Sequence, residues 1–200
     1  MRLIKALAIL HNAGTPVIRT NDAAALLGQS RASASKVLAR MADDGHIRRL
    51  IRGVWLIDQK VHPWSVHAFL SEPAPSYISL QTALFHHGMI EQIPAIIHMI
   101  SPAKTRTFRT PLGTFAMHQV APEFFCGFES FDGRSAQIAC PEKAMVDFFY
   151  FRLARSRGFR SLPELTLPKS FSKKKALKFA ALIQSASRRA LVERLISEVL

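Results

Sequence analysis

Nine serine, arginine and lysine residues between positions 30 and 52 have the types and spacing of a surface that contacts a polyanion. Guanidinium and ammonium groups neutralise phosphates, while short hydroxyl and cationic side chains hydrogen-bond to base edges. One group lies in a stretch of helical pattern and the other in a stretch of β pattern: Ser30, Arg31, Ser33, Ser35, Lys36 and Arg40, and then Arg48, Arg49 and Arg52. The chemistry that they suit is nucleic-acid binding.

The first group is expected on the second helix of a helix-turn-helix. Ser30 can cap this helix, because a serine hydroxyl accepts a hydrogen bond from a free N–H group of the first turn. The inward positions follow helical spacing: Val37, Leu38 and Met41. A preceding short helix, with Thr20, Asn21 and Asp22 as candidate N-caps, ends at Gly28. A helix, a tight turn and a second helix follow one another, as in helix-turn-helix motifs.

A basic β-hairpin is expected directly after this motif. Residues 47–57 are rich in β-branched and aromatic side chains and turn near Arg52 and Gly53. Such a hairpin is a wing, whose basic tip lies along phosphates or in the minor groove while the recognition helix enters the major groove. A helix over residues 2–13 and a short strand at residues 17–18, paired with the wing, complete the unit.

Length and charge favour two domains and an anionic partner. The 200 residues are 48% hydrophobic, enough for a buried core, and we divide them into residues 1–60, the winged helix-turn-helix, and residues 61–200. The formal charge of +13 suits nucleic acid, an acidic protein or, less favoured, an anionic membrane surface. This charge divides into +6 over residues 1–60, −2 over residues 61–149 and +9 over residues 150–200.

The basic C-terminal end needs an explanation of its own. Four lysines fall on the early turns of a helix that Ser170 or Ser172 caps: Lys173, Lys174, Lys175 and Lys178. Cations at a helix N-terminus oppose the macrodipole, at a cost of at most about 1 kcal/mol per charge. A solvated helical surface and an accessory contact with DNA or a protein partner are both open explanations.

The chain between the basic ends has the pattern of a mixed domain. Four β-like runs follow one another: residues 96–100, 105–109, 114–119 and 135–139. A tight turn at residues 111–113 joins the second run to the third, which favours an antiparallel sheet, and a largely apolar helix opens at Pro141. The expected fold class is α+β: an N-terminal winged helix-turn-helix followed by a mixed domain with a small antiparallel sheet and C-terminal helices.

Few residues suggest catalysis or metal binding. Asp147 lies within the apolar helix, where a buried carboxylate is more often paired with an arginine, here Arg106 or Arg109, than catalytic. His86 and His87 are adjacent on a helix and point about 100° apart, so they cannot chelate one metal ion together. The sequence contains no hydrolase, nucleotide-binding or zinc motif, and we expect no catalytic residue, no metal and no cofactor.

The sequence also indicates a reduced intracellular environment. Cys126 and Cys140 lack the spacing and histidine partners of a zinc site, and two cysteines make no disulfide framework. Lys5 breaks the N-terminal apolar run, which is followed by no small-residue cleavage site, and no stretch reaches the roughly 18 apolar residues of a membrane span. We expect a cytoplasmic protein without membrane contact.

Three segments of the sequence are informative when they are taken together and in their order along the chain. The segments are residues 47–55, residues 77–84 with the following Gly88, and residues 138–147. The last contains Pro-Glu-Lys-Ala, preceded by a small residue, Cys140, and followed by Asp147. Together they resemble the AbiEi family of type IV toxin–antitoxin antitoxins, which are also transcriptional regulators.

The resemblance implies a two-domain repressor of its own toxin–antitoxin operon. Its winged helix-turn-helix is expected to bind double-stranded DNA of its own promoter at inverted repeats. The C-terminal domain is expected to counter a nucleotidyltransferase-like toxin without a stable complex, although the basic C-terminal end departs from the family. Two alternatives remain: a winged-helix module for protein or RNA binding without sequence-specific DNA binding, and an enzyme that uses Asp147 or the histidines.

Overall fold

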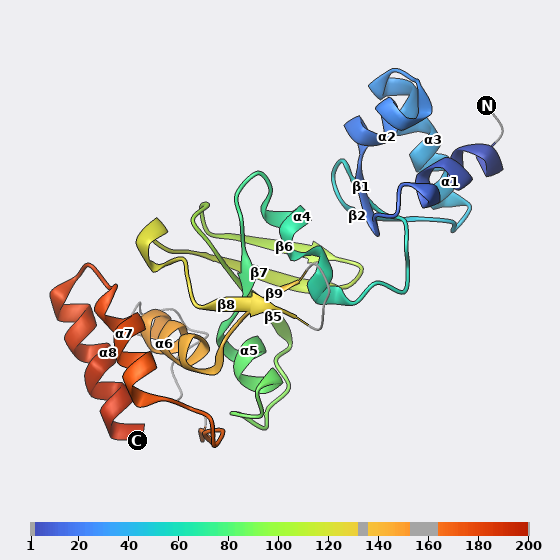
Figure 1. The fold of residues 1–200 in the computed structure, drawn as a ribbon. Coiled ribbons are helices and arrows are strands. Elements are labelled where there is room, and N and C mark those ends of the chain that lie inside the picture. Colours follow the sequence, from blue (N-terminus) through green and yellow to red (C-terminus); the bar gives the residue numbers. More distant parts are fainter. Residues whose placement is uncertain (1–2, 132–135, 153–163, 200) are drawn as a thin grey trace.

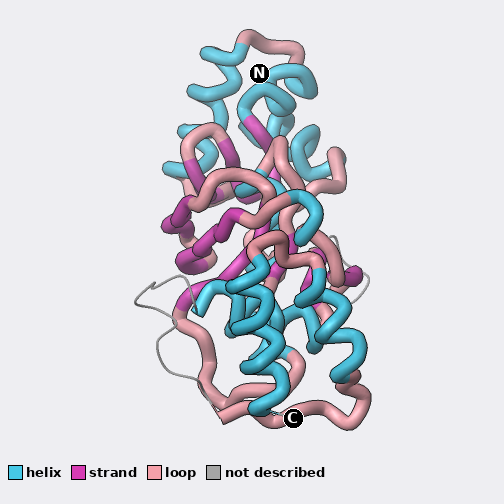
Figure 2. Tube along the Cα trace, turned by 90° about the vertical axis from the view of Figure 1, so that its left-hand side faces the viewer, coloured by secondary structure: helices cyan, strands magenta, loops and turns pink. Residues whose placement is uncertain are grey.

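Helices at the two ends of the molecule enclose a central tier of strands (Figures 1 and 2). The computed structural model describes residues 3–131, 136–152 and 164–199. The N-terminal helices lie at one end and the C-terminal helices at the other, with a three-stranded and a six-stranded sheet between them. The fold class is α+β, as the sequence predicts.

The N-terminal unit has the order of elements predicted from the sequence. Its elements are α1 (Leu3–Asn12), β1 (Val17–Arg19), α2 (Thr20–Leu27), α3 (Arg31–Asp43), β2 (Arg48–Ile51) and β3 (Val54–Leu56). The strands form an antiparallel sheet in the order β1-β3-β2, so the strand at residues 17–18 does pair with the wing. Gly28 ends α2 in the left-handed conformation (φ 60°), which glycine adopts without strain.

Strands β1 and β3 of the three-stranded sheet are buried on both faces. Trp55 in β3 packs into an apolar cluster with α1, α2 and α3, whereas its neighbours Val54 and Leu56 belong to a larger cluster that extends through the rest of the chain. In β1, Ile18 and Val17 divide between the two clusters in the same way. Because successive side chains of a strand point to opposite faces, this one sheet joins the helix-turn-helix to the rest of the chain.

A polar contact reinforces that junction. Arg19, at the end of β1, donates from Nε to Glu72 Oε2 at 2.5 Å and from an Nη atom to the carbonyl oxygen of Phe69 at 3.1 Å. Val66 and Leu70, which follow the three-stranded sheet in the chain, are buried in the larger cluster. The three-stranded sheet is therefore held to the segment at residues 66–72 by apolar packing and by the hydrogen bonds of Arg19.

The rest of the chain builds a six-stranded sheet and the C-terminal helices. Its elements are η1 (Pro63–Val66), α4 (His67–Ser71), β4 (Tyr77–Ile78), α5 (Leu80–His86), β5 (Ile96–Ser101), β6 (Arg106–Thr110), β7 (Gly113–Gln119), η2 (Pro122–Phe124), β8 (Phe128–Ser130), β9 (Gln137–Ala139), α6 (Pro141–Arg152), α7 (Lys173–Ala181) and α8 (Ala186–Val199). The strand order is β6-β7-β5-β4-β9-β8. Helix α6 is the central core helix, and α7 and α8 pack beside it (Figure 1).

The six-stranded sheet is larger and more mixed than the small antiparallel sheet expected. The predicted turn at residues 111–113 does join β6 to β7 as an antiparallel pair. Strand β7 then lies between β6 and β5, parallel to β5, and β9 joins β4 in a second parallel pair. Residue patterns predict strands and hairpins, whereas the pairing of strands distant in sequence depends on how the helices pack.

Candidate nucleic-acid interface

Helix α3 separates an apolar face from a polar one. Ala34, Leu38 and Met41 are buried against the other helices of the unit, with Val37 partly buried. The predicted contact residues on this helix are all exposed: Arg31, Ser33, Ser35, Lys36 and Arg40. Ser30 caps the helix as predicted, since its Oγ accepts from Ser33 N at 3.2 Å and donates to Ser33 Oγ at 3.0 Å. Because Ser33 is bonded to this cap, the exposed side chains of α3 best placed to contact a ligand are those of Arg31, Ser35, Lys36 and Arg40.

The arginines of the wing point to different sides of the β2–β3 hairpin. Arg49 lies opposite Trp55, and Arg48 lies opposite Leu56. Directly opposed residues share a face, so Arg49 is on the side of the helix-turn-helix and Arg48 is on the side of the larger apolar cluster. Arg52 is exposed at the tip of the hairpin.

Helix α3 and the wing line one open hollow of about 610 Å³. The lining residues come from the start of α2, the first turns of α3 and the hairpin: Thr20, Arg31, Ala32, Ser35, Arg49, Arg52, Gly53 and Trp55. The structure thus brings Arg31 and Ser35 together with Arg49 and Arg52. Lys36, Arg40 and Arg48 lie outside the hollow's lining.

Two residues that sequence reasoning missed form the base of this hollow. Trp55 donates from Nε1 to Thr20 Oγ1 at 3.0 Å. Thr20 in turn donates to the carbonyl oxygen of Gly53, from Oγ1 at 3.3 Å and from its backbone N at 3.0 Å. The guanidinium carbon of Arg49 lies 4.7 Å from the centroid of the Trp55 ring. No local pattern connects positions 35 apart in the chain, so the sequence carried no signal for this contact.

The expected capping of α2 by Thr20, Asn21 or Asp22 is wrong. The N-cap is Arg19, which makes no side-chain capping hydrogen bond. The physical reason is that the Thr20 hydroxyl is already bonded to the wing, where it satisfies the buried indole N–H group of Trp55.

Asp147 belongs to a buried polar network, and its predicted pairing with Arg106 or Arg109 is wrong. Its carboxylate accepts hydrogen bonds from Lys143 Nζ, from Ser79 Oγ at 2.7 Å and from Tyr77 Oη at 3.1 Å. Burial raises the pKa of the Asp147 carboxyl, and the three donors act against that rise. The spacing of four residues on one helix could have identified the lysine.

The arginines of β6 are exposed instead. The guanidinium carbon of Arg106 lies 4.9 Å from the centroid of the Phe108 ring, and Arg109 faces solvent. Strand β6 is an edge of the six-stranded sheet and lies beside β2, the edge of the wing sheet. The fully buried Asp147 therefore pairs with Lys143 of its own helix and not with either of these arginines.

The adjacent histidines have structural contacts. His87 donates from Nε2 to the carbonyl oxygen of Ala139 at 2.7 Å, and the His86 ring packs against Trp64 with centroids 5.4 Å apart. Among the described residues, no group of three or more histidine, cysteine, aspartate or glutamate side chains is placed to hold a metal ion. The described parts of the chain therefore offer no metal centre of that kind.

Three other histidines have pKa values lowered by burial. The pKa of His67 is about 4, that of His98 about 3 and that of His118 about 4. His67 Nε2 accepts from Gln137 N at 3.0 Å, so its Nδ1 carries the proton and donates to Ser76 Oγ at 2.7 Å. These contacts favour a neutral ring that ties α4 to β9.

The C-terminal lysines do not share one environment. Lys175 forms an ion pair with the nearly buried Glu142, with Nζ 2.9 Å from Oε2. Ser172 caps α7 as predicted, and its backbone N donates to Glu142 Oε1 at 3.0 Å. The remaining three lysines are exposed and border an open apolar patch on α7: Lys173, Lys174 and Lys178. Lys175 is thereby distinguished as a residue that holds α7 to α6.

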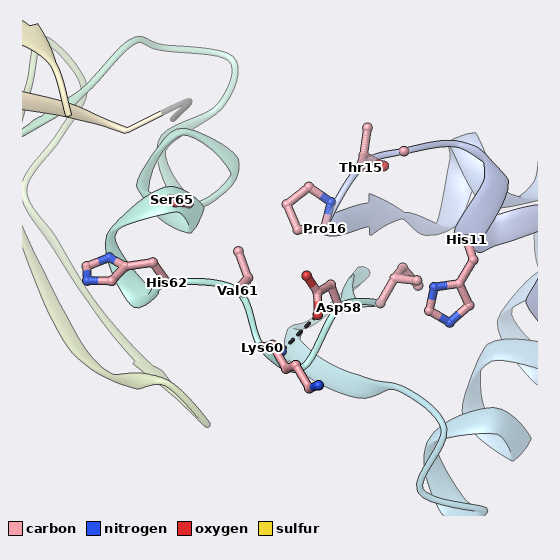
Figure 3. Close-up of a pocket in the computed structure, with 10 residues that line it drawn as sticks. His11, Thr15, Pro16, Asp58, Lys60, Val61, His62 and Ser65 are labelled. Atoms are coloured by element: carbon pink, nitrogen blue, oxygen red, sulfur yellow. Dashed lines mark hydrogen bonds between the residues drawn. The ribbon is translucent and has the colours of Figure 1, made fainter. Parts of the chain in front are cut away.

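A second hollow, of about 540 Å³, lies at the junction of the two parts of the chain (Figure 3). His11 lies on one side of it and His62 on the other, with Asp58 and Lys60 between them. Lys60 N donates to Asp58 Oδ1 at 2.9 Å, which closes a turn in the connecting segment. This hollow mixes both signs of charge, unlike the one between α3 and the wing.

The described residues contain no helix that is both long and apolar enough to cross a membrane.

Comparison with known proteins bears on the same part of the chain as the interface. No curated protein matches this sequence. One family model does match, and its range, residues 6–57, runs from α1 to just past the end of the wing. The resemblance noted in the sequence is confirmed over this range: residues 6–57 match the family described as "Transcriptional regulator, AbiEi antitoxin".

Proposed function

We propose that this chain is a DNA-binding repressor of its own toxin–antitoxin operon and the antitoxin of a type IV system. The observation that carries the proposal is the hollow in which Arg31 and Ser35 of α3 meet Arg49 and Arg52 of the wing. A recognition helix next to a basic hairpin can enter a major groove while the hairpin holds the adjacent backbone. The family match over residues 6–57 supports the same function.

In this proposal the two parts of the chain have different tasks. Residues 1–60 bind double-stranded DNA at inverted repeats in the promoter and repress by occupying it. Residues 61–200 counter a nucleotidyltransferase-like toxin in the cytoplasm without a stable complex. Arg52→Ala should therefore weaken repression and leave protection from the toxin intact when the neighbouring toxin gene is co-expressed. Loss of protection in this variant, with normal protein levels, would contradict the division of tasks.

The direct test is the affinity of the purified full chain for DNA upstream of its gene and for a scrambled duplex of equal length, over a series of salt concentrations. The full chain is needed because Val54 and Leu56 of the wing pack into the larger cluster. We expect a preference for the upstream DNA above the roughly 10³-fold that marks the lower end of specific recognition. Equal and steeply salt-dependent binding to both duplexes would contradict repression at a specific site, and no duplex binding at low salt would favour a protein or RNA interaction module.

A further inference from the structure

The hollow between α3 and the wing has an excess of positive charge at its surface. Its lining includes three guanidinium groups, those of Arg31, Arg49 and Arg52, and none of the described residues that line it is acidic. Within the described part of the chain, none of these arginines lies within ion-pair distance of a carboxylate. Positive charges held together without a counter-charge repel one another, so a bound anion would stabilise this arrangement.

The position of Arg49 is fixed by a chain of contacts that crosses the unit. Its guanidinium group is held over the ring of Trp55, a residue that is only 2% exposed. The indole N–H group is satisfied by Thr20, whose hydroxyl and backbone N both bond to Gly53 at the wing tip. Arg49 also lines the hollow, so its guanidinium N–H donors can reach an anion bound there.

The chemistry of the hollow suits a phosphate group of a diester backbone. Guanidinium groups donate paired hydrogen bonds to phosphate oxygens, and a site that is already assembled loses little side-chain entropy on binding. The first turn of α3 adds the positive end of a thirteen-residue helix at the same place. A neutral or purely apolar ligand would leave the arginines uncompensated.

We propose that this hollow is a preformed binding site for one phosphate of the DNA backbone, with Arg49 as the central contact and Trp55 and Thr20 as positioning residues. The inference rests on the proposed function and specifies which backbone contact the wing makes. It also predicts different roles for two adjacent arginines: Arg49 contacts the phosphate, whereas Arg48 points to the other face of the hairpin and does not.

The test uses the full chain and a random-sequence duplex several helical turns long, since a phosphate contact needs no particular sequence. Arg49→Ala should weaken binding about tenfold or more and make the slope of log affinity against log salt shallower by about 0.9. Lys169→Ala, which removes one exposed positive charge from a turn before α7, is the matched control and should leave the slope unchanged. An unchanged slope in Arg49→Ala would overturn the phosphate site.

A double-mutant cycle tests the positioning role. Thr20→Val removes the hydroxyl at nearly constant volume and should weaken binding several-fold in the wild-type background but not in Arg49→Ala. Thr20→Ser keeps the hydroxyl and should restore the affinity. Equal effects of Thr20→Val in both backgrounds would overturn the positioning role, and thermal unfolding of each variant identifies a loss of folding. Failure of the wild-type chain to bind any duplex would instead refute the proposed function itself.

Discussion

Trp55 and Leu56 are consecutive residues of β3 that are buried in two different apolar clusters, one under the helix-turn-helix and one extending through the rest of the chain. A single strand therefore contributes to both cores. We expect the N-terminal unit and the rest of the chain to unfold together, since loss of either core exposes one face of the same sheet.

Leu56→Ala should lower the free energy of unfolding by about 2–5 kcal/mol, because it removes a fully buried side chain. Fluorescence and circular dichroism in a urea titration should report one coincident transition. Leu26→Ala, at a position 46% exposed, is the control and should change stability by no more than about 0.5 kcal/mol. Two separate transitions would contradict the joint core.

Asp147→Asn should destabilise the chain by about 3–5 kcal/mol, because it leaves the buried Lys143 without its counter-charge. The double variant Lys143→Met with Asp147→Leu should lose less, since no charge remains buried. Urea titrations measure both. If Asp147→Asn instead abolished a biological activity with stability unchanged, Asp147 would be a functional residue, as the enzyme interpretation requires.

Stability should fall as the pH is lowered from about 6.5 to about 4. In the folded chain the pKa of His67 is about 4, so the unfolded chain, with an ordinary value of 6.5, takes up the proton first. Free energy of unfolding then decreases by up to about 1.4 kcal/mol per pH unit for each such group. His67→Gln should flatten this dependence relative to the wild type. An identical dependence in the variant would show that His67 is not the group responsible.

Lys175→Ala should lower the free energy of unfolding, because the buried carboxylate of Glu142 loses its positively charged partner. Lys174→Ala, on the exposed side of the same helix, should leave stability within about 0.5 kcal/mol of the wild type. Thermal unfolding of the two variants makes the comparison. Equal losses would mean that the Glu142 ion pair has no particular structural role.

Local patterns predicted the elements of the interface. The Ser30 cap, the end of α2 at Gly28 and the turn at residues 52–53 are set by neighbours in sequence, and each occurs where the pattern places it. The polar face of α3 follows from helical periodicity in the same way.

Local patterns did not predict the contacts between residues that are distant in the sequence. The hydrogen bond from Trp55 to Thr20 and the parallel pairing of β5 with β7 both depend on how whole elements pack. Ser79 illustrates the same limit: it occupies the N-cap position of α5, yet its hydroxyl donates to Asp147, 68 positions away. The arrangement of Arg31 and Arg49 around one hollow is likewise a product of tertiary packing.

The central claim is that the wing holds the DNA backbone while α3 reads bases, and two variants of the full chain test it most directly. Affinity for upstream and random-sequence duplexes is measured over a salt series for each. Arg52→Ala should weaken both by the same factor and make the salt slope shallower by about one unit, whereas Lys36→Ala should change the ratio between them. If Arg52→Ala left both affinity and slope unchanged, the wing would not contact DNA and the account would be wrong.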